Sequence, residues 1–194
     1  MRPAVFLDRD GTMIEDVGYL NDLSRIALYP WTVDVIRMLN RAGFAVVVVT
    51  NQSGIARGIL TEALVTETHR RIDARLAAGG AHVDGYYHCP HYPHRGGDGY
   101  AARCECRKPG RGMVDKAAAD LALDPASSFV IGDRWIDVQL GRAVGARAVL
   151  VRTGSGAAEE LQAPPGVEAD AVVDNLAAAA SWLLRAHLHS ATSI

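Results

Sequence analysis

Residues 44–49 form a continuous apolar run, Phe-Ala-Val-Val-Val-Val, with no polar residue alternating along it. Such a run is typical of a β-strand covered on both faces, as in parallel sheets. Shorter apolar runs predict further strands at residues 5–7, 83–88, 129–132, 148–151 and 171–173. Helical spacing between them predicts helices over residues 31–42, 61–78, 113–123, 137–144 and 175–188. This alternation predicts an α/β fold with a doubly wound, three-layer, Rossmann-like parallel sheet.

Two segments fall outside this alternation. Residues 90–112 are rich in Gly, Pro, His and Arg, which predicts a long irregular excursion, and residues 157–166 are expected to form a surface loop. The connections after the first two strands are too short for a large cap domain. With 194 residues, 49% of them hydrophobic, the chain is expected to form a single domain over 1–194 with a sizeable core.

Composition excludes several classes of partner. A net charge of −2 predicts no general attraction to nucleic acid or to an anionic membrane. No segment approaches the ~18 apolar residues of a membrane span, and Asp8 interrupts the apolar run near the N-terminus, which argues against a signal peptide. Three cysteines are an odd number and argue against a disulfide framework. We therefore expect a cytoplasmic protein. We also expect a monomer that acts on a small molecule.

Polar side chains follow three of the predicted strands at the point where each ends. Asp8 and Asp10 follow the first strand, residues 50–53 follow the second, and Asp133 follows the strand at 129–132. In open parallel sheets, ligands bind beyond the carboxyl ends of the strands. Residues two apart on an extended chain point the same way, so Asp8 and Asp10 can share a divalent cation. The sequence therefore predicts one acidic cleft at this edge of the sheet.

These residues supply what cleavage of a phosphate monoester requires, namely a nucleophile, a metal, donors for the phosphoryl oxygens and an acid for the leaving oxygen. Asp8 can be the nucleophile, and Asp10 can protonate the leaving alkoxide and then activate water against the aspartyl phosphate. Thr50 can donate its hydroxyl, and Lys108 brings a positive charge to the transferring group. Asp133 completes, with Asp8 and Asp10, a carboxylate set for Mg²⁺.

The order of these residues resembles the haloacid dehalogenase superfamily of phosphohydrolases. The chain reads Asp8-Arg9-Asp10-Gly11-Thr12, then Thr50, then Lys108, then Gly132-Asp133 followed by Asp137, so all four superfamily motifs occur in order. The resemblance implies hydrolysis through an aspartyl-phosphate intermediate. Superfamily members that only transfer or bind phosphoryl groups often lack the second aspartate, which is present here as Asp10. Asp137 is expected to support the Mg²⁺ site.

A second metal site is predicted between residues 88 and 110. Cys89 and His91, followed by Cys104 and Cys106, form a Cys₃His set typical of tetrahedral Zn²⁺, although each pair is closer in sequence than in most zinc fingers. His88 and His94 are alternatives to His91. A site closed by four protein ligands has no position for substrate, so we expect a structural zinc that fixes Arg107 and Lys108, which follow the last ligand directly.

Zinc-loop phosphatases of this superfamily act either on D-glycero-D-manno-heptose 1,7-bisphosphate or on histidinol phosphate. Residues 50–58, Thr-Asn-Gln-Ser-Gly-Ile-Ala-Arg-Gly, are similar to the heptose type, as are residues 16–19, 104–109 and 149–154. The resemblance implies removal of the 7-phosphate of a sugar bisphosphate in nucleotide-activated heptose biosynthesis. The expected substrate contacts are Asp16, Gly18, Tyr19, Asn51, Gln52, Ser53, Arg57, Arg107 and Arg134.

Three alternatives stay open to different degrees. Histidinol phosphate carries a cationic amine, which Glu15 and Asp16 can accommodate, so a histidinol-phosphate phosphatase remains a rival. A catalytically silent zinc-organised binding module is a rival of another class, and the intact pair of Asp8 and Asp10 argues against it. A nucleic-acid 3′-phosphatase shares the first motif, but the sequence has no basic stripe or aromatic platform.

Overall fold

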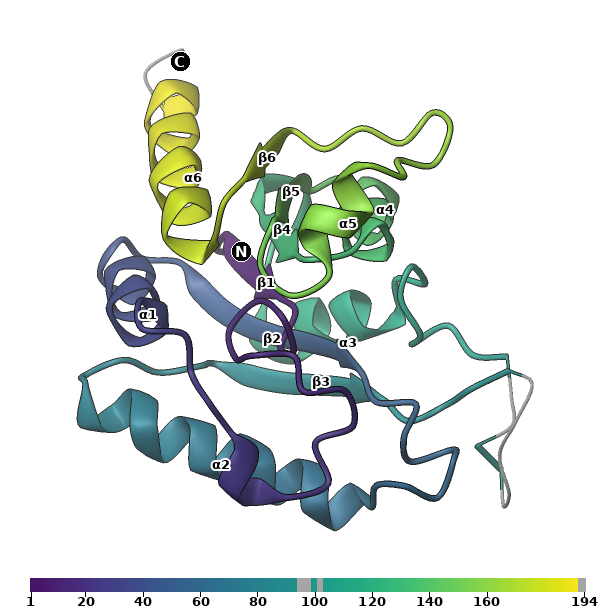
Figure 1. The fold of residues 1–194 in the computed structure, drawn as a ribbon. Helices are drawn as coiled ribbons and strands as arrows, with labels where there is room; N and C mark the ends of the chain where they lie inside the picture. The colour runs from purple at the N-terminus through teal and green to yellow at the C-terminus, as the bar shows by residue number, and fades with distance from the viewer. Residues whose placement is uncertain (94–98, 101–102, 192–194) are drawn as a thin grey trace.

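A six-stranded parallel sheet forms the centre of the computed structural model, which describes residues 1–93, 99–100 and 103–191 (Figure 1). Its strands are β1 (Ala4–Leu7), β2 (Ala45–Asn51), β3 (Gly85–Cys89), β4 (Phe129–Gly132), β5 (Arg147–Val151) and β6 (Ala171–Val173). Their order is β3-β2-β1-β4-β5-β6, and each neighbouring pair is parallel. The order reverses between β1 and β4, which is the topological switch point where such sheets bind ligands.

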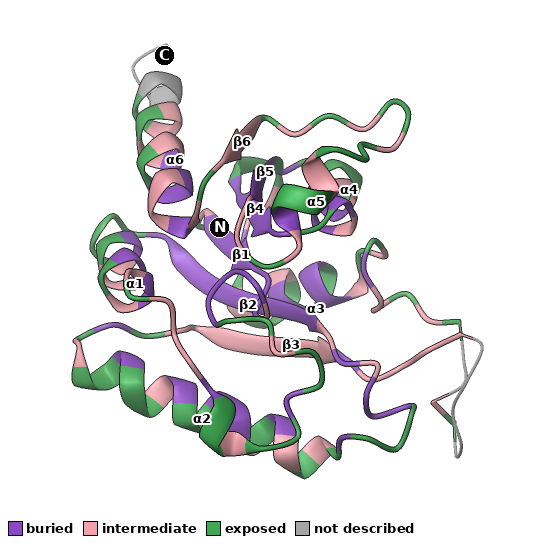
Figure 2. Ribbon diagram, in the orientation of Figure 1, coloured by how far each residue is buried: buried purple, intermediate pink, exposed green. Residues whose placement is uncertain are grey.

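Helices cover both faces of the sheet, and alternate residues of β1 show how the core divides. Val5 and Leu7 pack in the cluster that includes α1 (Thr32–Arg41), α2 (Glu62–Ala78) and α6 (Leu176–Ala191). Ala4 and Phe6 pack in the opposite cluster, with α3 (Gly112–Leu121) and α4 (Trp135–Val144). Figure 2 shows β1 and β2 as buried and the edge strands β3 and β6 as mostly half-buried. The predicted three-layer α/β fold is confirmed.

The connections near the switch point contain little regular structure. Between β1 and α1 lie isolated β-bridges and a single 3₁₀ turn, η1 (Leu23–Arg25), and residues 52–61 between β2 and α2 form turns. In the described part of the chain, these two connections therefore hold no separate cap domain. None of the described helices is both long and apolar enough to cross a membrane.

One predicted loop is partly helical. Residues 157–166 were expected to be a surface loop, but the segment begins within a short helix, α5 (Gly156–Glu160). The Trp135 backbone amide donates to the Glu159 carboxylate over 3.1 Å, and the indole nitrogen donates to the Glu159 carbonyl over 2.6 Å. These bonds dock α5 against α4, and such a long-range contact has no signature in the local sequence.

Several element boundaries also differ by one to three residues from the prediction. The strand expected to begin at residue 83 begins at Gly85, because the Asp84 carboxylate accepts the Val46 amide hydrogen over 2.8 Å. The helix expected to reach residue 123 ends at Leu121, because Ala122 adopts a left-handed conformation with φ of 54°. A second 3₁₀ turn, η2 (Pro125–Ser127), follows.

The helix that follows β4 begins earlier than predicted. It starts at Trp135 rather than at Asp137, and the Asp137 carboxylate accepts the Arg134 backbone N–H over 3.2 Å. An acidic side chain at the third helical position satisfies an amide that would otherwise lack a partner. Asp137 therefore sits in the first turn of α4, close to the end of β4.

Candidate active site

The carboxyl ends of β1, β2 and β4 surround a cavity of about 270 Å³. Nearly all the residues predicted from the sequence to act on substrate line it, and Arg57 is the exception among the predicted contacts. The lining includes Asp8, Asp10, Asp16, Gly18, Tyr19, Thr50, Asn51, Gln52, Ser53, Arg107, Lys108, Asp133, Arg134 and Asp137. The convergence that parallel topology predicted is therefore present.

A buried ammonium group lies at the base of the cavity. Lys108 is 4% exposed, and its Nζ lies 2.5 Å from Asp8 Oδ1 and 2.7 Å from Asp137 Oδ1, and donates to the Val49 carbonyl over 2.9 Å. Burial disfavours the charge, but the two carboxylates outweigh that cost and place the pKa of Lys108 above its ordinary value. Lys108 is therefore a permanent cation beside the predicted nucleophile.

Asn51 holds the backbone of this lysine. The Lys108 amide donates to Asn51 Oδ1 over 3.0 Å, and Asn51 Nδ2 donates to the Lys108 carbonyl over 3.3 Å. Asn51 was predicted to contact substrate; it lines the cavity, but its amide group is engaged by the chain itself, and a substrate contact stays a prediction. The last residue of β2 thus fixes a loop residue that is distant in sequence.

Three buried carboxylates form a candidate site for a divalent cation. Asp8, Asp133 and Asp137 each offer one oxygen, and these oxygens lie within 4.8 Å of one another. Burial raises the pKa of Asp8 to about 8, against the opposing effect of Lys108, and burial raises the pKa of Asp133 to about 6. Crowded carboxylates that resist ionisation together gain most from a bound cation, and oxygen ligands suit Mg²⁺.

Asp10 makes different contacts from the other predicted Mg²⁺ ligands. Its carboxylate accepts hydrogen bonds from Arg9 Nε and Nη2, over 3.2 and 3.1 Å, and from Gln52 Nε2 over 2.9 Å. Gln52 Nε2 also donates to Thr50 Oγ1 over 2.9 Å. The metal-binding role of Asp10 stays a prediction, whereas Asp137, expected only to support the site, lies within the carboxylate group.

The loop after β5 completes the surroundings of Asp133, and no role was predicted for its residues. Ser155 N donates to Asp133 Oδ2 over 2.7 Å, and Thr153 Oγ1 donates to the Gly11 carbonyl over 2.6 Å. A Cβ placed on Gly11 or on Gly154 would lie 2.3 Å from Asp133 Oδ2. Both glycines have positive φ, +83° and +57°. The available signal was Gly154, three residues past the end of a strand, but its contact with Asp133 depends on the folded loops.

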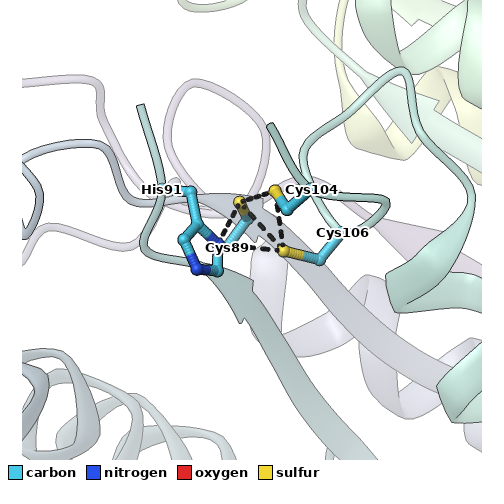
Figure 3. Close-up of side chains that lie close together, drawn as sticks. All are labelled: Cys89, His91, Cys104 and Cys106. Carbon is cyan, nitrogen blue, oxygen red and sulfur yellow. Dashed lines mark hydrogen bonds between the residues drawn. The ribbon is translucent and has the colours of Figure 1, made fainter. Parts of the chain in front are cut away.

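The predicted Cys₃His residues form a compact group (Figure 3). Five separations among the three Sγ atoms and His91 Nδ1 run from 3.1 to 3.7 Å, and none of the three cysteines is in a disulfide. Four ligands about 2.3 Å from a central ion would be roughly 3.8 Å apart, slightly farther than these atoms are, so a small outward shift of the side chains would let the group hold a tetrahedral metal. His88 is engaged elsewhere, with its Nε2 2.5 Å from Glu62 Oε2, and His94 lies outside the described residues.

The Cys₃His group is connected to the cavity through the chain on both sides. Cys89 ends β3, and its carbonyl accepts the hydrogen of the Gln52 backbone amide over 2.8 Å. Cys106 precedes Lys108 by two residues, and the intervening Arg107 donates to the His91 carbonyl over 3.3 Å. A metal held by this group would therefore constrain the segment that carries Lys108.

The predicted cationic contacts lie beside this loop. The Arg57 guanidinium is 4.2 Å from the Tyr92 ring centroid and 6.0 Å from that of Tyr19, and Arg107 is 5.4 Å from the Tyr92 ring. The shared ring brings two positive charges together through cation–π contacts. Arg134 also lines the cavity, and its Nη2 donates to Ser155 Oγ over 3.3 Å. Polyanionic ligands suit such an arrangement.

Comparison with known proteins gives consistent matches. A family model described as polynucleotide kinase 3 phosphatase matches residues 4–141, and one described as HAD-hydrolase-like matches residues 105–179. The D-glycero-β-D-manno-heptose-1,7-bisphosphate 7-phosphatase of Yersinia pestis is 42% identical over 90% of this chain and 92% of its own length. The enzyme of the same name from Haemophilus influenzae is 38% identical over 90% of this chain and 95% of its own.

Solved structures agree. The D,D-heptose 1,7-bisphosphate phosphatase of B. bronchiseptica, complexed with magnesium and phosphate, is 34% identical and matches with a TM-score of 0.82 over 95% of this chain and 99% of that one. A HAD-like phosphatase from Mesorhizobium loti is 35% identical, with a TM-score of 0.81 over 96% of this chain and 86% of that one.

The glycine contacts of Asp133 generate a test. A methyl group on Gly154 would displace the Asp133 carboxylate. Gly154→Ala should therefore weaken Mg²⁺ binding about 10- to 100-fold, which is the usual effect of losing a residue that orients a metal ligand. Gly166→Ala is the matched control, because Gly166 also has positive φ, +74°, but a Cβ there meets nothing within 4 Å. Titration calorimetry with Mg²⁺ measures both. Equal affinity in the two variants would show that the glycine contacts do not hold Asp133.

Proposed function

Because this chain belongs to the HAD-like phosphatases and, within them, to the D-glycero-β-D-manno-heptose-1,7-bisphosphate 7-phosphatases, we propose that it hydrolyses the 7-phosphate of that sugar bisphosphate with the aid of Mg²⁺. The observation that carries the proposal is the buried group of Asp8, Asp133 and Asp137 around Lys108, at the switch point of the sheet. A relative of the same fold holds magnesium and phosphate.

In the first half-reaction the Asp8 carboxylate attacks the phosphorus atom. Lys108 fixes one oxygen of Asp8, and the other oxygen forms the new O–P bond as the bond from phosphorus to the sugar oxygen breaks. Asp10 gives its proton to that leaving oxygen, which departs as the sugar hydroxyl. Mg²⁺, when bound by the carboxylates of Asp8, Asp133 and Asp137, would offset the negative charge of the phosphoryl oxygens. Lys108 and the Thr50 hydroxyl add positive charge and a donor at the same place.

The second half-reaction releases phosphate. Asp10, now ionised, takes a proton from water as the water oxygen attacks phosphorus and the O–P bond to Asp8 breaks. Asp8 is regenerated as a carboxylate, and Asp10 is again protonated for the next cycle. Both steps therefore need the same carboxyl group at the same position.

Arginine side chains are proposed to select a bisphosphate. Arg57 and Arg107 share the Tyr92 ring, and Arg107 and Arg134 line the cavity that contains Asp8. Charge-assisted hydrogen bonds to a second phosphate contribute about 1.5–3 kcal/mol each. A substrate with one phosphate cannot make these contacts, so its binding is weaker.

The Cys₃His group is proposed to hold a structural Zn²⁺. Three sulfur ligands and one imidazole are the ligand set that Zn²⁺ prefers, and all four positions of a tetrahedron are filled by protein. Burial and the neighbouring Cys106 thiol raise the pKa of Cys89, so a metal is needed to hold that residue as a thiolate. The ion would brace the loop that leads from Cys106 to Lys108.

Initial rates on a substrate panel test the activity. D-glycero-β-D-manno-heptose 1,7-bisphosphate should give a kcat/KM at least about tenfold above heptose 7-phosphate, histidinol phosphate and a 3′-phosphorylated oligonucleotide, because only the bisphosphate engages the arginines in full. Asp8→Asn should abolish phosphate release from it. A higher kcat/KM for histidinol phosphate or the oligonucleotide would contradict the proposed substrate. Phosphate release by Asp8→Asn would contradict the covalent mechanism.

Loss of the zinc ligands tests the structural metal. Cys104→Ala should lower the zinc content measured by elemental analysis and lower kcat about 10- to 100-fold at saturating Mg²⁺, because Lys108 loses its bracing. His88→Gln is the control, because His88 lies in β3 directly before Cys89 and its Nε2 is 2.5 Å from Glu62 Oε2, and this variant should keep both zinc and activity. A zinc-free Cys104→Ala protein with full turnover in excess Mg²⁺ would contradict the bracing role.

A further inference from the structure

Arg9 separates the two aspartates of the first motif, and its side chain points into the protein. It is 1% exposed and is among the largest fully buried side chains of the described residues. Its guanidinium contacts both oxygens of Asp10, with Nε 3.2 Å from Oδ2 and Nη2 3.1 Å from Oδ1 and 2.9 Å from Oδ2. Contacts from two nitrogens of a planar guanidinium to both oxygens of a carboxylate fix its position and its plane.

The other side of the guanidinium is held by His69 of α2. Arg9 Nη1 lies 3.3 Å from His69 Nε2. Arginine only donates, so Nε2 must be the acceptor and the imidazole is neutral with its proton on Nδ1. Burial and the charge of Arg9 lower the pKa of His69 to about 3, which keeps the imidazole neutral at any working pH.

A further layer orients the imidazole. The His69 ring stacks on Tyr86 of β3, with centroids 4.4 Å apart and an interplanar angle of 17°. The Tyr86 hydroxyl donates to Asp73 Oδ1 over 2.7 Å. A continuous set of contacts therefore runs from α2 and β3 through His69 and Arg9 to the carboxylate of Asp10.

We propose that Arg9 and His69 are positioning residues that set the orientation of Asp10 for its two proton transfers. The inference rests on the proposed role of Asp10 as acid and base. Asp10 must first give a proton to the leaving oxygen and then take one from the attacking water at the same place, and a displacement of about 1 Å can cost roughly 100-fold in rate. Buried ion pairs add little to stability compared with apolar packing, so a fold does not need this pair for its own sake.

A double-mutant cycle separates this role from a structural one. Arg9→Lys keeps the charge and loses the two-bond geometry, so the single-turnover rate should fall about 10- to 100-fold while KM changes less than about twofold. In an Asp10→Asn background, the same change should alter the residual rate less than about twofold. A full Arg9→Lys loss that persists in Asp10→Asn would overturn the inference. Wild-type turnover in Asp10→Asn would instead overturn the proposed acid and base role.

A second pair of variants tests the same role without depending on whether the Arg9→Lys protein folds. His69→Gln retains an acceptor for Arg9, whereas His69→Phe retains the ring stack on Tyr86 and removes the acceptor. We expect His69→Phe to lower kcat at least about fivefold and His69→Gln to recover most of it. Thr68→Val is the control, because Thr68 is buried next to His69 on α2 and its hydroxyl donates to the Leu64 carbonyl of the same helix. Equal losses in both His69 variants would contradict the positioning role.

Discussion

The buried ammonium of Lys108 is the interaction on which the site depends. A charge removed from water is costly unless it is paired and hydrogen-bonded. Lys108 meets this condition with three oxygen partners, the carboxylates of Asp8 and Asp137 and the carbonyl of Val49. These partners come from the end of β1, the first turn of α4 and the end of β2. The cavity can be assembled only when the elements around the switch point are in place together.

This dependence explains why a polar loop needs a brace. The segment between Cys89 and Lys108 is rich in Gly, Pro, His and Arg, so it has few apolar residues with which to anchor itself. Asn51 fixes the Lys108 backbone from one side, and the Cys₃His group constrains the chain just before it. In the proposed mechanism the tetrahedral metal replaces the hydrophobic burial that this segment lacks, and it holds Arg107 and Lys108 beside Asp8.

Much of this arrangement could be predicted from the sequence. Asp8 and Asp133 directly follow parallel strands, Thr50 lies at the end of another, and the topology alone brings such ends together. The Cys₃His group could be predicted because its pairs are close in sequence. Asp137 was expected to support the Mg²⁺ site, and its place beside Asp8 and Asp133 was not predicted, because a carboxylate in the first turn of a helix also suits a plain cap.

Other features depend on contacts that no local pattern encodes. The orientation of Asp10 is set by Arg9 and Gln52, one of them held in turn by a histidine from a distant helix. The surroundings of Asp133 depend on Gly154 coming close to the loop after β1. The short helix α5 exists where a loop was expected because Trp135 docks against it. In each case the partners lie far apart along the chain.

In the proposed mechanism, Lys108 is the charge that lets Asp8 become phosphorylated. Rapid-quench mass spectrometry of the peptide that contains Asp8, after mixing with heptose bisphosphate and Mg²⁺, measures that step directly. Wild-type protein should carry a transient phosphoryl group on Asp8, and Lys108→Met should form it at least about 100-fold more slowly, because one preorganised cation is typically responsible for an effect of that size. A phosphoryl group on another residue, or an unchanged rate of formation in Lys108→Met, would contradict the account.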